Sequence, residues 1–106
     1  MNRVPGVGVV QEPSVTLLPP TGVTNLQYEL LPLSGNTRPV QLTWTPDPTA
    51  ISYETLVEYT GATASQIMNN SVTINLPNWT GTPPVQAGIR SVNATGSVNR
   101  YVSITL

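Results

Sequence analysis

Apolar and polar residues alternate along several short stretches of this chain, a pattern typical of half-buried β-strands. The clearest stretch is 40–44, where Val40, Leu42 and Trp44 fall on one face with polar residues between them. A Pro-Asp-Pro sequence at 46–48 ends it, because proline cannot donate to a strand ladder. The same alternation predicts further strands at 23–30, 72–76, 85–92 and 98–106.

The segment 53–59 presents two alternative faces. One face carries Tyr53, Thr55, Val57 and Tyr59, and the other carries Leu56 between two glutamates. Aromatic and β-branched residues pack well on a pleated, half-buried surface. We therefore expect the face with the tyrosines to be buried and Leu56 to point away from the core.

Turns separate these stretches at short intervals. Eleven prolines and eight glycines interrupt the chain, so few windows are long enough for a helix. We expect turns at 34–36, 60–61, 69–70 and 94–96, and a short edge strand within 63–68. Six or seven short strands in one domain's length predict an all-β fold of two packed sheets, an immunoglobulin-like β-sandwich.

The alternation also predicts the core. Trp44 should lie between the two sheets, in contact with Tyr59, Ile74 and Ile89. The residues expected in the core are Trp44, Leu42, Val57, Tyr59, Ile74, Leu76, Ile89, Val102 and Ile104.

Composition narrows the chemistry that we expect. Only 8% of the 106 residues are charged, lysine is absent, and the net charge is −1, so there is no basic patch for nucleic acid or an anionic membrane surface. We identify no signal peptide and no membrane-inserting segment. Cysteine and histidine are absent, which removes disulfides, the commonest soft metal ligands and the usual general base.

No catalytic arrangement emerges from the remaining residues, and we expect neither an enzyme nor a cofactor or metal. Glu54 and Glu58 can share a strand face, but four residues apart they would be about 13 Å apart, beyond the separation of a glycosidase pair. We interpret them as solvated charges. Asp47 is expected to form a turn. The candidate binding residues are Trp79, Tyr101, Arg90 and Arg100, because exposed aromatics anchor interfaces; the alternative is that Trp79 closes one end of the sandwich and Tyr101 covers an outer face.

Residues 1–18 differ from the rest of the chain. Their prolines favour extended backbone, which predicts a linker, yet Val9-Val10 and the apolar run at 15–18 also suit an arm that pairs with an edge strand. Residues 19–106 should form the domain itself.

Several motifs in the correct order resemble the fibronectin type III family. The stretch 40–46 resembles its second strand, 53–59 its third, and the Val-Asn-Ala-Thr-Gly run at 92–96 the end of its sixth strand and the following loop; 19–26 resembles the approach to its first strand. The resemblance implies fibronectin type III topology with about seven antiparallel strands. The family's tyrosine at the start of the sixth strand is missing, since Val85 stands there, and Trp79 is our candidate to fill that corner.

The resemblance, with the uncharged composition, suggests a non-catalytic module of a tailed-phage tail tip or tail fibre, located in the virion and attaching to a host-surface protein or glycan. Its partners would be other domains or subunits of a larger assembly. The alternative is a spacer or carbohydrate-binding accessory module of a secreted bacterial enzyme or surface protein. A third hypothesis is a free-standing protein that joins an assembly by strand addition through its apolar arm.

Overall fold

The computed structural model describes residues 18–81 and 84–105 and confirms the all-β prediction. Seven strands follow one another along the chain: β1 (Thr24–Leu30), β2 (Arg38–Thr45), β3 (Ser52–Val57), β4 (Thr63–Ala64), β5 (Ser71–Leu76), β6 (Val85–Val92) and β7 (Ser97–Ile104). Every pairing between them is antiparallel.

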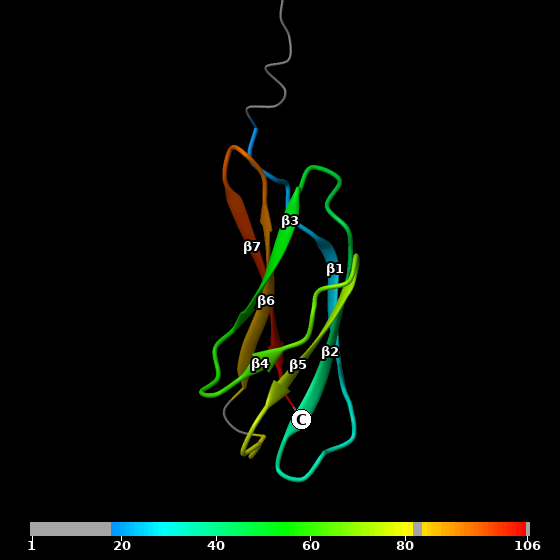
Figure 1. Cartoon of the computed structure of the whole chain (residues 1–106), viewed down its shortest axis with the longest axis vertical. Helices are drawn as coiled ribbons and strands as arrows, with labels where there is room; N and C mark the ends of the chain where they lie inside the picture. The colour runs from blue at the N-terminus through cyan, green and yellow to red at the C-terminus, as the bar shows by residue number, and fades with distance from the viewer. Residues whose placement is uncertain (1–17, 82–83, 106) are drawn as a thin grey trace, which may run out of the picture.

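The strands form two sheets that pack face to face (Figure 1). One sheet has the order β1-β2-β5-β4, and the other has the order β3-β6-β7. This is the distribution of strands in a seven-stranded immunoglobulin-like sandwich of the constant type. The predicted short edge strand is present as β4, and it pairs with β5 and not with β3.

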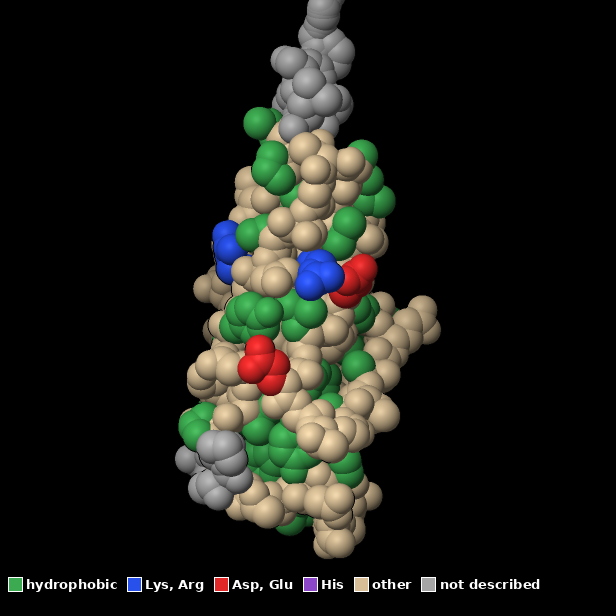
Figure 2. Space-filling model, turned by 90° about the vertical axis from the view of Figure 1, so that its left-hand side faces the viewer, with side chains coloured by type: hydrophobic (Ala, Val, Ile, Leu, Met, Phe, Trp, Pro, Cys, Tyr) green, Lys and Arg blue, Asp and Glu red, His purple; other side chains and the backbone are tan. Residues whose placement is uncertain are grey.

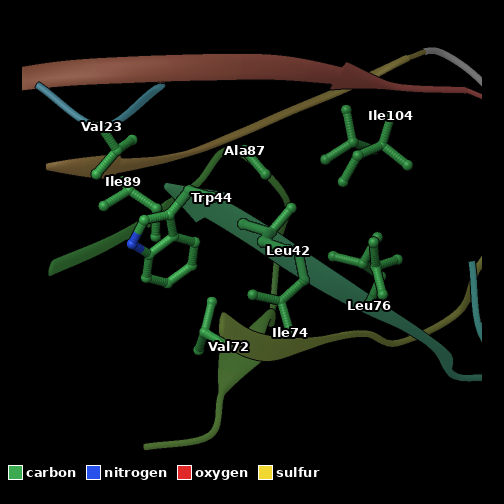
Figure 3. Packing of buried hydrophobic residues seen from close by; sticks show 11 residues of the cluster. Val23, Leu42, Trp44, Val72, Ile74, Leu76, Ala87, Ile89 and Ile104 are labelled. Atoms are coloured by element: carbon green, nitrogen blue, oxygen red, sulfur yellow. The ribbon is translucent and has the colours of Figure 1, made fainter. Parts of the chain in front are cut away.

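The core lies between the sheets and comes from the alternating apolar positions. In β2 the side chains of Val40, Leu42 and Trp44 are buried, and in β5 every second residue is buried in the same way. Leu42, Ile74, Leu76, Ile89, Ile104 and Trp44 belong to the buried cluster, while Val57, Tyr59 and Val102 pack against it from half-buried positions. Figure 3 shows the Trp44 indole within this cluster, among residues from β5, β6 and the segment before β1.

The aromatic partner of Trp44 differs from the expected one. Tyr53 meets the Trp44 ring edge-on, with ring centroids 5.8 Å apart, whereas Tyr59 packs against Trp79 at 6.2 Å. The opposite directions of β2 and β3 explain why Tyr53, and not Tyr59, contacts Trp44. β2 runs towards the loop at 46–51 and β3 leaves it, so the first tyrosine of β3 faces Trp44, and Tyr59 lies about 20 Å further along an extended chain. The buried face of β3 is nevertheless the tyrosine face, since Tyr53, Val57 and Tyr59 all pack against the core.

At one pole of the sandwich, which we call the upper pole, three segments meet. These are the segment before β1, the β2–β3 loop and the β6–β7 turn. Asn93 joins them, since its side-chain amide donates to the carbonyl oxygens of Leu18 and Thr49, both at 3.1 Å.

The opposite pole, the lower pole, is closed by the loop that follows β5. Tyr59 donates its hydroxyl to the carbonyl oxygens of Pro77 (2.6 Å) and Asn78 (3.0 Å). Trp79 donates its backbone N–H to Asn36 in the β1–β2 loop at 2.9 Å. Val85 stands at the start of β6, where the fibronectin type III family has a tyrosine, yet a tyrosine hydroxyl still closes this corner. That hydroxyl belongs to Tyr59, in the segment after β3.

The chain enters at the upper pole and leaves at the lower one (Figure 1). Of the predicted arm at 1–18, only Leu18 belongs to the described residues, and its side chain is exposed; the linker and pairing hypotheses for the rest lie outside them. In the described part of the chain, no helix has the length and apolarity that crossing a bilayer demands.

Candidate functional site

The outward side of the β3-β6-β7 sheet, here called the outer face, carries a group of hydrogen-bonded polar side chains around an exposed tyrosine. Strand register sets them in three rows. Glu54, Arg90 and Asn99 form one row, and Leu56, Gly88 and Tyr101 form the next. Gln86 and Ser103 face each other in the third row. Glu58 lies at the end of this row, because its backbone N–H donates to the Gln86 carbonyl oxygen. Figure 2, which views this side of the molecule, shows a basic and an acidic group together above an apolar patch, with another acidic group below.

Gly88 is the reason that Tyr101 sits as it does. Gly88 points outward on its strand but is buried, while Tyr101 beside it on β7 is 47% exposed. A Cβ atom at position 88 would stand 3.0 Å from Cδ1 of the Tyr101 ring and would overlap the Arg100 carbonyl oxygen. Only glycine leaves room for the ring, whose Cδ1 atom lies beside position 88 while the side chain as a whole stays exposed.

A continuous chain of polar contacts leads across the sheet to the tyrosine. Arg90 forms an ion pair with Glu54 (Nη1 to Oε1, 3.2 Å) and donates from Nε to Oδ1 of Asn99 at 3.1 Å. Asn99 in turn donates from Nδ2 to the Tyr101 hydroxyl at 3.4 Å. The ion pair is exposed, so it adds little to stability, and the contacts that follow it end at the Tyr101 hydroxyl.

A hollow of about 430 Å³ lies beside the ring, lined by Glu58, Gln86 and Tyr101. The Gln86 amide donates to the Ser103 hydroxyl at 3.0 Å, which holds the amide plane in position. Within residues 18–81 and 84–105, the Glu58 side chain has no ion pair. The hollow therefore combines one aromatic ring with a carboxylate and a carboxamide that face solvent.

The four candidate binding residues do not come together. Arg90 and Tyr101 share the outer face. Arg100 lies at the upper pole, where its guanidinium covers Gly22 and donates to the carbonyl oxygen of Thr21 at 2.9 Å. Trp79 is half-buried at the lower pole and packs against the core.

Asp47 organises the upper pole from a buried position. Its Oδ2 accepts the backbone N–H of Gly22 at 2.7 Å, and its Oδ1 accepts the backbone N–H of Thr49 at 2.8 Å and the hydroxyls of Thr21 and Thr49. Burial raises the pKa of this carboxyl, but the hydrogen bonds from Thr49, Gly22 and Thr21 outweigh it, so the pKa lies below the ordinary Asp value. Asp47 does form the turn expected of it, and it also clamps the segment before β1 onto the β2–β3 loop.

An open apolar groove of about 650 Å³ runs across the same pole. Its lining is Leu18, Pro19, Pro20, Thr21, Thr49, Ile51, Asn93 and Ala94. Ile51 is 75% exposed there. The groove offers hydrophobic contact but few polar groups to orient a ligand, unlike the hollow on the outer face.

In chemical terms, the outer face offers an aromatic ring with hydrogen-bonding groups beside it. Among the described residues, no group of three or more acidic, histidine or cysteine side chains could hold a metal ion. Glu54 is engaged by Arg90, and Glu58 lies just after the end of β3, on the other side of the row that holds Leu56.

Sequence reasoning missed Gln86, and it interpreted Glu58 only as a solvated charge. The strand register brings both residues close to Tyr101, because it pairs the end of β3 with the start of β6, and β6 with β7. One signal was present in the sequence: Gly88 interrupts an otherwise apolar and polar alternation, and glycine inside a strand often marks a close approach.

Comparison of the chain with protein-family models, with curated proteins and with solved structures finds no match.

Proposed function

We propose that this chain is a non-catalytic recognition and structural module, a fibronectin type III-like domain of a tailed-phage tail tip or tail fibre. Its partners are other domains or subunits of that assembly, and its outer face meets a host-surface protein or glycan. The virion is its proposed location.

The observation that supports the proposal is the position of the two ends of the described chain at opposite poles of the sandwich. The described chain enters at one pole and leaves at the other, so neighbouring domains can be joined end to end without covering the outer face (Figure 1). The resemblance of 19–106 to the fibronectin type III family supports the same reading, as does a surface with few charges.

The test is to locate the protein in the particles of its source. An antibody raised against the purified domain should follow virions through a density gradient, and immunogold labelling should mark the tail tip or fibres. Preincubating host cells with the purified domain should lower phage adsorption. Recovery of the antigen only with a soluble secreted protein would overturn the tail proposal.

The second candidate is a carbohydrate-binding accessory module of a secreted bacterial enzyme or surface protein. The exposed Tyr101 ring beside a carboxylate and an amide favours it. The same fractionation separates the two, because an accessory module would be recovered in a larger secreted or cell-surface polypeptide.

A further inference from the structure

We propose that the hollow beside Tyr101 binds a neutral pyranose ring of a glycan, with the sugar stacked on the exposed side of the tyrosine ring. This inference deepens the proposed recognition role and rests on it. It assigns the ligand class and the residues that hold the ligand: Tyr101, Glu58 and Gln86.

The shape of the platform is the first argument. A pyranose has a face of C–H groups and a rim of hydroxyls, so it needs a flat apolar surface with polar groups beside it. Tyr101 supplies the flat surface because Gly88 lets the ring lie against the backbone of β6. Tyrosine also suits a wet surface, since its body is apolar and its hydroxyl is polar.

The polar groups of the hollow are the second argument. Sugar hydroxyls donate readily, and the Glu58 carboxylate accepts hydrogen bonds that are stronger than those between neutral groups. Gln86 adds a carboxamide whose plane is set by its bond to Ser103. Both groups line the same hollow as the ring, so one bound sugar ring can meet all three.

Charge and size select the ligand class. Glu58 disfavours an acidic sugar or a phosphate, because two negative charges would meet at short range. An anionic ligand would need a free cation, but Arg90, the arginine in the three rows of this face, is already bonded to Glu54 and Asn99. The hollow's volume of about 430 Å³ lies within the range of small-molecule sites, roughly 300–1,000 Å³, and admits one or two sugar rings.

The experiment is an NMR titration of the full chain, labelled with ¹⁵N, against the methyl glycosides of glucose, galactose, mannose and N-acetylglucosamine. At least one should shift the amide signals of Gln86, Gly88 and Tyr101 in a saturable manner, with Kd of about 1 mM or weaker, as expected for a single stacked ring. Signals of the upper pole, including Ile51, should not move.

Three variants separate stacking from structure. Tyr101→Ala should weaken binding by about tenfold or more, because the stacking surface is lost. Tyr101→Phe keeps the ring and should bind within about twofold of the parent, and Glu58→Gln should weaken binding by about threefold, since a charged acceptor becomes neutral. Ile51→Ala, at the apolar groove, is the matched control and should leave the affinity unchanged.

Several outcomes would overturn the inference. These are no saturable shift with any of the four sugars, shifts confined to the upper pole, or equal affinity of Tyr101→Ala and the parent while Tyr101→Ala retains a folded spectrum. Protection of the outer face by a protein subunit of the assembly, with no sugar response, would also overturn it. Virion labelling without sugar binding refutes this inference alone, and sugar binding without virion labelling refutes the tail proposal alone.

Discussion

Asp47 reaches back 25 residues along the chain to accept the backbone N–H of Gly22 through Oδ2 at 2.7 Å. The contact is buried and joins the segment before β1 to the β2–β3 loop. Arg100 covers Gly22 from β7, so residues from three distant parts of the sequence meet at one glycine. Gly22 has φ of +98°, a conformation that other residues rarely adopt, which keeps the site specific for glycine.

Replacing Asp47 with alanine should therefore destabilise the domain by about 2–4 kcal/mol. The substitution removes a charged acceptor and leaves the buried N–H of Gly22 without a partner. Urea denaturation should measure the loss as a lower midpoint at an unchanged slope. Glu29→Ala, at an exposed position of β1, is the control and should change stability by less than about 0.5 kcal/mol.

The same carboxyl should make stability depend on pH. Its folded pKa is depressed, so its contribution is complete above the unfolded Asp pKa of about 3.9 and is lost as pH falls through the lower folded value. The stability difference between the parent and Asp47→Asn should accordingly hold from neutral pH to about pH 5 and shrink as the pH is lowered from there to about 2. A difference that stays constant over this range would contradict the assignment.

Trp44→Ala should cost about 3–5 kcal/mol, because the indole is buried between the sheets and the void cannot fully collapse. Trp79→Ala should cost less, since that ring is half-buried at the lower pole. Thermal unfolding followed by far-ultraviolet circular dichroism would rank the two. Equal losses would show that Trp44 is not the centre of the core.

Gly88→Ala should destabilise the domain by at least about 2 kcal/mol, because the new methyl group would clash with the backbone of β7 at Arg100. Gly96→Ala is the matched control. Its nearest new neighbour would be the Pro19 Cβ at 3.9 Å, an ordinary contact, so stability should change by less than about 0.5 kcal/mol. Chemical denaturation of the pair would measure both, and a neutral Gly88→Ala would contradict the close approach of the two strands.

Ser91→Ala should stabilise the protein by about 1 kcal/mol. Ser91 is fully buried on the inward side of β6, and its hydroxyl has no hydrogen-bond partner among the described residues. Ser103→Ala, on the outer face, should be nearly neutral in comparison. A lower melting temperature for Ser91→Ala would mean that the hydroxyl has a partner after all.

The local pattern was sufficient to predict the strands, the turns at 34–36 and 94–96, and the buried positions of β2 and β5. It could not predict contacts that depend on how strands are set beside one another. Tyr53 and Tyr59 are equivalent in the alternation, and only the direction of β3 relative to β2 decides which of them meets Trp44.

The candidate site shows the same limit more strongly. Tyr101 and Arg90 were identifiable as exposed side chains of suitable chemistry, but Glu58 and Gln86 acquire their role from the pairing of β3, β6 and β7. Asp47 was recognisable as a turn residue between two prolines, while its bond to Gly22 depends on tertiary packing.

The arrangement of the two chain ends at opposite poles also has a mechanical consequence. Tension applied between Leu18 and Thr105 runs along the strands, so the ladders that hold β1 to β2 and β7 to β6 are loaded in shear, with many hydrogen bonds sharing the force at once. Such a domain resists stretching far better than one whose ladders are peeled open bond by bond.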